Sequence, residues 1–153
     1  LIQKNFSRIM SLKDGMKKMS KSDPSDLSRI NLTDEKDLIV NKIKKAKTDN
    51  MPMPTIEENL EKRPEVENLL GIYSSLSNQT LDQSKKEFDG KNFSDFKEKL
   101  SDLLVQKIDP ISKEIKKLMN EKDFLDKILS DGCKKANDIA SDKVKKMHEI
   151  IGF

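Results

Sequence analysis

The sequence predicts a mainly α-helical protein, and three observations support that fold class. Charged residues make up 37% of the 153 residues, whereas hydrophobic residues make up 34% and aromatic residues 5%. Gly and Pro number only five each. Apolar residues recur at the period of an α-helix over most of the chain, so this balance favours charged amphipathic helices over sheets.

The expected helices follow from caps, breakers and apolar spacing. The first dozen residues, around Phe6 and Ile9, are consistent with the end of a strand that runs into a loop. Thr33 is a suitable N-cap for the first helix, and the two prolines of the segment Met51–Pro54 cannot continue it. The helices are expected over 34–47, from Pro64 through Leu76, over Leu81–Phe88 before Gly90, from Asp95 to about Met119 with a kink at Pro110, and over Asp123–Leu129 and Cys133–Ile151.

Composition also limits the class of function. The net charge of +3 combines 30 basic and 27 acidic residues, so any site for a polyanion must come from local clustering. A lone Cys133 excludes an internal disulfide, and with a single His148 it offers no zinc set, which favours a reducing compartment. No apolar run approaches the roughly 20 residues of a membrane span, so we expect a soluble protein without a membrane partner.

The loop Lys18-Met-Ser-Lys-Ser22 is the segment whose residue types imply a reaction. It lies between Gly15 and Asp23-Pro24 in a stretch without helical periodicity. Two ammonium groups three positions apart can both reach one triphosphate. When a carboxylate attacks the α-phosphate of ATP, negative charge grows on the departing pyrophosphate, and positioned cations stabilise that transition state. Lys18 and Lys21 are therefore candidate catalytic residues, although an ordinary solvated basic loop has the same composition.

Several segments in register resemble one family of enzymes. Arg8–Leu12 followed by Lys18–Pro24 resembles the second signature of class I aminoacyl-tRNA synthetases, and Lys42–Asp49 resembles the helix that follows it in the tryptophanyl and tyrosyl enzymes. The later segments resemble the tryptophanyl family in order and spacing. They are Arg63–Tyr73, Phe88–Lys91 with Phe96-Lys97, and Asp131–Asn137 with Val144-Lys145.

The resemblance implies a division of the chain and a set of roles. Residues 1–24 would be the C-terminal end of a Rossmann-like catalytic domain, and residues 25–153 a helical anticodon-binding domain. The implied activity is ATP-dependent activation of tryptophan to tryptophanyl-adenylate and its transfer to tRNA(Trp), with Mg²⁺ accompanying ATP. The nucleotide-binding positions carried over are Ile9 and Met19, whose backbone would lie against the adenine, and Lys18, Ser20, Lys21 and Ser22, which would serve the phosphates.

The sequence also departs from the family. The other class I signature requires two histidines, and this chain has only His148, so we expect the amino-terminal catalytic half to be absent and the chain alone to be inactive. The tryptophan pocket and a homodimer interface would belong to that half. No metal ligands are expected within this chain, and the expected location is a bacterial cytoplasm, with the mitochondrial matrix as the alternative.

Three alternative functions remain open from the sequence. The chain could belong to a tyrosyl enzyme, form a non-catalytic helical tRNA-binding module, or serve as a charged helical interaction protein. The last expected helix bears five lysines beside an apolar stripe, which suits phosphate contacts. Asp138, Asp142 and Glu149 alternate with those lysines, so the same helix also suits an ordinary solvated surface.

Overall fold

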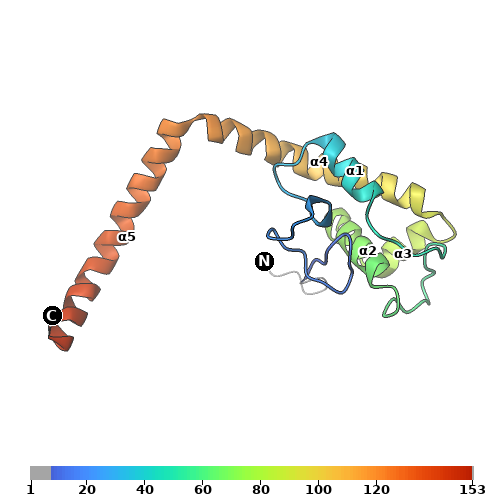
Figure 1. The fold of residues 1–153 in the computed structure, drawn as a ribbon, viewed down its shortest axis with the longest axis horizontal. Helices are drawn as coiled ribbons and strands as arrows, with labels where there is room; N and C mark the ends of the chain where they lie inside the picture. The colour runs from blue at the N-terminus through green and yellow to red at the C-terminus, as the bar shows by residue number, and fades with distance from the viewer. Residues whose placement is uncertain (1–7, 153) are drawn as a thin grey trace. The chain divides into compact units, whose positions relative to one another are not determined.

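The computed structural model describes residues 8–152, and Figure 1 shows their helical elements. Within these residues the elements are η1 (Asp26–Ser28), α1 (Lys36–Lys44), α2 (Pro64–Ser77), α3 (Leu81–Phe88), α4 (Phe93–Asn120) and α5 (Lys122–Ile151). The prediction of a mainly helical protein is confirmed. The chain forms two compact units, of which the first runs to Ser112 and the second begins at Lys113.

The segment expected to end a strand makes a single bridge in its described part. Met10 pairs with Lys18 in an isolated antiparallel bridge, and the neighbouring residues form no named strand. The pairing stops there because the Leu12 amide donates to the Ser28 carbonyl at 2.9 Å, while the Leu12 carbonyl accepts from the Lys47 amide at 2.8 Å. Phe6, which belonged to the same prediction, lies outside the described residues.

Helix α1 is shorter than predicted. It occupies Lys36–Lys44 rather than 34–47, and Glu35 rather than Thr33 holds the N-cap position, without a side-chain capping bond. The start is delayed because the Asp34 carboxylate is used elsewhere: it accepts from the Asn31 amide at 2.9 Å and from Lys42 Nζ at 2.6 Å.

The first unit has one apolar core, built by α1 to α4 together with residues outside these helices, which include Leu12, Ala46, Met53 and Leu60. Tyr73, Phe88 and Phe96 meet edge to face at its centre, with ring centroids 4.9 Å apart for Tyr73 and Phe88 and 4.8 Å apart for Phe88 and Phe96. Leu12 is 2% exposed in the same cluster. The loop that precedes η1 is therefore packed against the helices.

Helix α2 begins as the sequence predicts, with Pro64 at its first position. It ends at Asn78, which adopts a left-handed conformation with φ of 57°. Thr80 and Gln83 then form a complete capping box at the start of α3. Local sequence therefore sets the turn between these two contacting helices.

The final two expected helices are one helix, so the predicted break near Gly132 is wrong. Helix α5 runs without interruption from Lys122 to Ile151 (Figure 1). A glycine inside a helix costs about 1 kcal/mol relative to alanine, which is too little to end a helix whose neighbouring residues all favour it. Pro110 likewise lies inside α4 without ending it.

The segment between α1 and α2 has little regular structure and is held by Arg63. This side chain is 5% exposed, and its Nε lies 2.7 Å from Asp49 Oδ2. Its Nη1 lies 2.8 Å from Glu58 Oε1, and its Nη2 donates to the Pro52 carbonyl at 2.8 Å. One guanidinium thus fixes three points of the proline-containing segment. In the described part of the chain, no helix is long and apolar enough to cross a membrane.

Gly132→Ala and Gly90→Ala should change stability in opposite directions. A Cβ at either glycine meets no atom within 4 Å, but Gly90 has φ of +70°. We expect Gly132→Ala to raise helix content and stabilise α5 by about 1 kcal/mol, and Gly90→Ala to destabilise the protein by about 1 kcal/mol. Circular dichroism at 222 nm during urea unfolding measures both. A loss of helicity in Gly132→Ala would contradict a continuous α5.

Acid should weaken the fold by protonating Asp49, the carboxylate that pairs with Arg63. Burial opposes ionisation of Asp49, but hydrogen bonds from Arg63 and the Met51 amide outweigh it and lower the pKa of Asp49 below its ordinary 3.8. A carboxyl group with a lowered pKa contributes stability above its unfolded pKa and loses it as pH falls through the folded pKa. We therefore expect Asp49→Asn to be less stable than the parent at pH 7, with the two free energies of unfolding converging below pH 3.8. Asp89→Asn, at an exposed position, is the control. Its free energy of unfolding should differ little from that of the parent both at pH 7 and below pH 3.8.

Candidate functional site

The loop predicted to bind nucleotide begins on the second arm of a short hairpin, which pairs with the first arm around Met10. Beside the Met10 and Lys18 bridge, the Ser11 amide donates to the Lys17 carbonyl at 2.8 Å. The Met19 amide donates to the Ile9 carbonyl at 3.0 Å. The structure therefore brings together Ile9 and Met19, the two residues whose backbone was predicted to contact adenine.

The four residues predicted to serve phosphates are exposed in the same loop. Lys18, Ser20, Lys21 and Ser22 all face solvent. Ser20 organises the turn, because its Oγ accepts from the Ser22 amide at 3.2 Å and its carbonyl accepts from the Asp23 amide at 3.3 Å. Among residues 8–152, neither Lys18 nor Lys21 has a carboxylate within ion-pair distance, so both ammonium groups are available to an external anion.

Asn68 fixes the entering arm of this hairpin, and the sequence analysis did not identify it. Its side chain is buried on α2, where its Oδ1 accepts from the Met10 amide and its Nδ2 donates to the Met10 carbonyl, both at 2.9 Å. Both backbone groups of Met10 are thereby satisfied by one side chain. The available signal was a polar residue between the apolar residues Val66 and Leu69 of an amphipathic helix.

Gly15 seats the tip of the hairpin against the start of α2. A Cβ at this position would lie 2.5 Å from the Glu65 nitrogen and from the Pro64 carbonyl carbon. These are backbone atoms, which cannot move aside as a flexible side chain can. The close approach therefore requires glycine and places the hairpin directly on the helix terminus.

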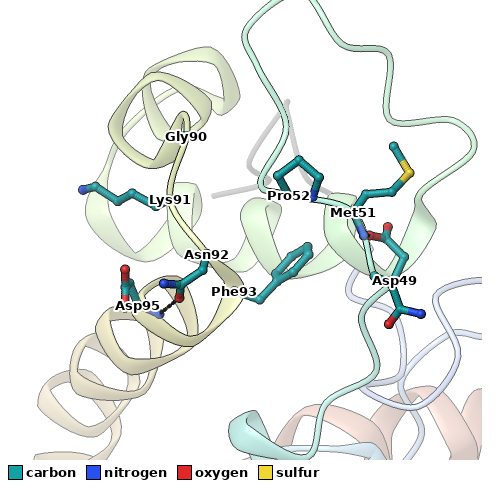
Figure 2. A pocket seen from close by; sticks show the side chains of 9 residues that line it. Asp49, Met51, Pro52, Gly90, Lys91, Asn92, Phe93 and Asp95 are labelled. Carbon is teal, nitrogen blue, oxygen red and sulfur yellow. Dashed lines mark hydrogen bonds between the residues drawn. The ribbon is translucent and has the colours of Figure 1, made fainter.

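A separate pocket of about 560 Å³ lies beside the start of α4 (Figure 2). Asp49, which pairs with Arg63, and Met51 form one side, and Lys91, Asn92 and Asp95 form the other. Asn92 already caps the helix by accepting from the Asp95 amide at 2.9 Å, the bond drawn in Figure 2. The lining residues include two carboxylates and one ammonium group, so the pocket lacks the positive charge of a phosphate site.

The described residues contain no group of three or more His, Cys, Asp or Glu side chains that could hold a metal ion. On α5, the lysines singled out by the sequence are exposed, and so are the acidic residues between them. Contact of those lysines with RNA stays a prediction. The predicted boundary between residues 24 and 25 also stays a prediction, since the compact units divide the chain elsewhere.

Comparison with known proteins identifies the family. The sequence model of the family described as tRNA synthetases class I (W and Y) matches residues 2–147. The chain belongs to this family. The resemblance of the chain to class I synthetases is thereby confirmed at the level of the family, while the roles of the loop residues stay predictions.

Individual members of the synthetase family match nearly the whole chain. A tryptophan–tRNA ligase from Brucella melitensis biotype 1 is 49% identical over 146 residues, which are 95% of this chain and 41% of that protein. One from Rickettsia conorii is 48% identical over 153 residues, which are 100% of this chain and 46% of that protein. The crystal structure of a tryptophanyl-tRNA synthetase from Mycoplasma pneumoniae superposes with a TM-score of 0.78 at 28% identity, covering 99% of this chain and 45% of that one. This chain therefore spans less than half the length of these relatives.

Removing the Asn68 side chain should destabilise the hairpin and the first unit together. Asn68→Ala leaves the amide and carbonyl of Met10 without their partners, and each unsatisfied group costs about 1 to 3 kcal/mol. We expect the free energy of unfolding to fall by about 2 to 6 kcal/mol in urea titrations. Asn50→Ala, at an exposed position, is the matched control and should change it by less than about 0.5 kcal/mol. Equal effects of the two substitutions would contradict this role of Asn68.

Proposed function

We propose that this chain is the C-terminal portion of a tryptophan–tRNA ligase. The complete enzyme joins tryptophan to ATP, giving tryptophanyl-adenylate and pyrophosphate, and then transfers the tryptophanyl group to tRNA(Trp). The observation that carries the proposal is the hairpin loop with two exposed, unpaired lysines in a chain 49% identical to a tryptophan–tRNA ligase. Because the chain spans only part of such enzymes, it acts within a longer protein and is inactive alone.

The two loop lysines act by electrostatics. As the tryptophan carboxylate attacks the α-phosphorus, the bond to the bridging oxygen breaks and the charge of pyrophosphate develops. Lys18 and Lys21 stabilise that charge more in the transition state than in bound ATP, which is the condition for acceleration. Exposed ammonium groups without internal partners can be recruited to phosphate oxygens without breaking an ion pair.

The rest of the loop orients the nucleotide. The backbones of Ile9 and Met19, which are joined by a hydrogen bond, lie against the adenine, and Ser20 and Ser22 provide small polar groups beside the phosphates. A loop of small hydroxyl residues lets backbone amides approach an anion closely. ATP is thus the substrate that these six positions serve.

Mg²⁺ accompanies ATP in this proposal rather than residing in this chain. The described residues offer no cluster of metal ligands, and the loop supplies ammonium groups and hydroxyls instead of carboxylates. Bound to the triphosphate oxygens, the ion supplies further neutralisation of phosphate charge. We therefore assign no residue of this chain as a ligand of Mg²⁺.

The helical part of the chain contacts tRNA(Trp) near the anticodon in this proposal. The supporting feature is the row of exposed lysines on α5, whose charge suits a phosphate backbone. A homodimer would form through the portion of the enzyme outside this chain. The protein would work in a bacterial cytoplasm, with the mitochondrial matrix as the alternative.

Two other functions are tested by the same experiment. A tyrosyl enzyme shares the family and the loop, but the relatives compared above are tryptophan–tRNA ligases. A helical module that binds tRNA without chemistry would not need two lysines placed for a triphosphate.

The test is amino-acid-dependent exchange of pyrophosphate into ATP by the full-length protein. We expect exchange with tryptophan and none with tyrosine. Lys21→Ala should lower the rate by about 10² to 10³, the usual cost of removing one positioned charge-stabilising donor. The 153-residue chain alone should give no exchange.

Lys17→Ala is the matched control. Lys17 is exposed in the same loop and pairs only with its neighbour Asp14, at 3.4 Å, in the described residues. Its replacement should leave the exchange rate within about threefold of the parent. No exchange by the full-length protein with either amino acid would favour the non-catalytic tRNA-binding module.

A further inference from the structure

A cluster of charged side chains lies against residues 23–25, which directly follow the loop and form its leaving arm. The centre of the cluster is buried. Lys42 of α1 is 0% exposed, and its Nζ lies 2.6 Å from Asp34 Oδ2 and 2.7 Å from Asp26 Oδ2. Burying an ammonium group is costly unless carboxylates compensate it. Its neighbours Ile39 and Ile43 are buried apolar residues, so an apolar side chain would fill the same place at lower cost. The charge at this position therefore has a use other than packing.

The cluster continues from Asp26 to Arg29. The second oxygen of Asp26, Oδ1, lies 3.1 Å from Arg29 Nη2, and the Arg29 side chain is 17% exposed. Asn31 joins both carboxylates, because its Nδ2 donates to Asp26 Oδ1 and to Asp34 Oδ1, each at 3.1 Å. Arg29 Nε donates to Asn31 Oδ1 at 3.2 Å. The orientation of the guanidinium is thus set from two sides.

The far end of Arg29 holds the backbone that follows the loop. Its Nη1 donates to the Asp23 carbonyl at 2.9 Å and to the Ser25 carbonyl at 3.4 Å. Asp23 directly follows Ser22, the last residue of the loop. An unbroken series of contacts therefore runs from the core of α1, through Lys42, Asp26 and Arg29, to the end of the loop.

We propose that Arg29, held by Asp26 and the buried Lys42, is a positioning residue for the phosphate-binding loop. This inference rests on the function proposed above. A lysine side chain is long and flexible, so where the Lys21 ammonium can reach depends on where its backbone is fixed. The rigid fork of a guanidinium binds two carbonyls and a carboxylate at once, which the single ammonium of a lysine cannot reproduce in the same geometry.

Asn68 and Arg29 together confine motion to the loop between them. Asn68 fixes the entering arm at Met10, and Arg29 fixes the leaving arm at Asp23. Between these anchors, the hydrogen bonds that residues 20–22 make within the described part of the chain are local ones to Ser20. The loop can therefore close on a triphosphate and return to one defined position, which is what preorganised stabilisation of charge requires.

The test compares Arg29→Met and Arg29→Lys with the parent in the full-length protein. Arg29→Met keeps the apolar stem and removes the fork. We expect the maximal rate of tryptophan-dependent pyrophosphate exchange to fall roughly 10-fold to 100-fold, the usual cost of misplacing a reacting group by about 1 Å. The KM for tryptophan should change by less than about twofold, and Arg29→Lys should recover only part of the rate.

A double-mutant cycle with Lys21→Ala distinguishes positioning from general destabilisation. If Arg29 acts through Lys21, Arg29→Met should lower the rate by less than about twofold once Lys21 is gone. Lys99→Met is the control, since it removes an exposed pair of 3.1 Å with Glu87 outside this cluster. It should leave the exchange rate unchanged.

Hydrogen exchange gives a readout that does not depend on catalysis. The amides of residues 20–23 and of Ser25 should exchange faster in Arg29→Met, while those of α2 should not. The positioning role would be overturned if hydrogen exchange at residues 20–23 and Ser25 were unchanged in Arg29→Met, or if this variant kept the parent's rate of pyrophosphate exchange. It would also be overturned if Arg29→Met lowered that rate equally with and without Lys21. If the full-length parent itself shows no pyrophosphate exchange, the proposed function fails, and the hydrogen-exchange result then decides separately whether Arg29 anchors the loop.

Discussion

Two hydrogen bonds between the Asn68 side chain and the backbone of Met10 join the N-terminal loop to helix α2. The rest of the first unit depends on this junction, because it sets where Leu12 enters the core and where Gly15 meets the start of α2. The hairpin has a single bridge and only a few backbone hydrogen bonds of its own. A buried amide that satisfies both polar groups of one residue replaces the missing ladder and fixes the hairpin in a single place.

The same solution recurs where the chain is irregular. Lys42 and Arg63 are almost completely buried cations, and each binds acidic residues or carbonyls from a segment outside the regular helices. Helices need little help of this kind, since their backbone groups bond within the helix. The buried charges of this protein therefore serve the connections between helices, where direction has to be specified, while apolar contacts among α1 to α4 hold the helices together.

The separation of supporting residues from exposed lysines fits the catalytic role proposed for the loop. Its supports Asn68 and Lys42 are buried and Arg29 is only partly exposed, whereas the two lysines proposed to meet pyrophosphate are exposed and unpaired among the described residues. An ion pair inside the protein would have to be broken before a phosphate could be bound. Leaving the ammonium groups free while fixing the backbone on both sides lowers the reorganisation that accompanies substrate binding.

The sequence by itself determined the helical class and the start of α2 at Pro64, and it singled out the loop that we propose binds phosphate. These features depend on local chemistry: apolar spacing, a proline that fits the first turn, and two lysines three positions apart. The continuation of α5 through Gly132 is also a local property, since its many helix-favouring residues outweigh one glycine, although the sequence analysis placed a break there. Only the tertiary structure decided that Asn68 holds Met10 and that Lys42 is buried between two aspartates, because these contacts join segments that local sequence does not relate.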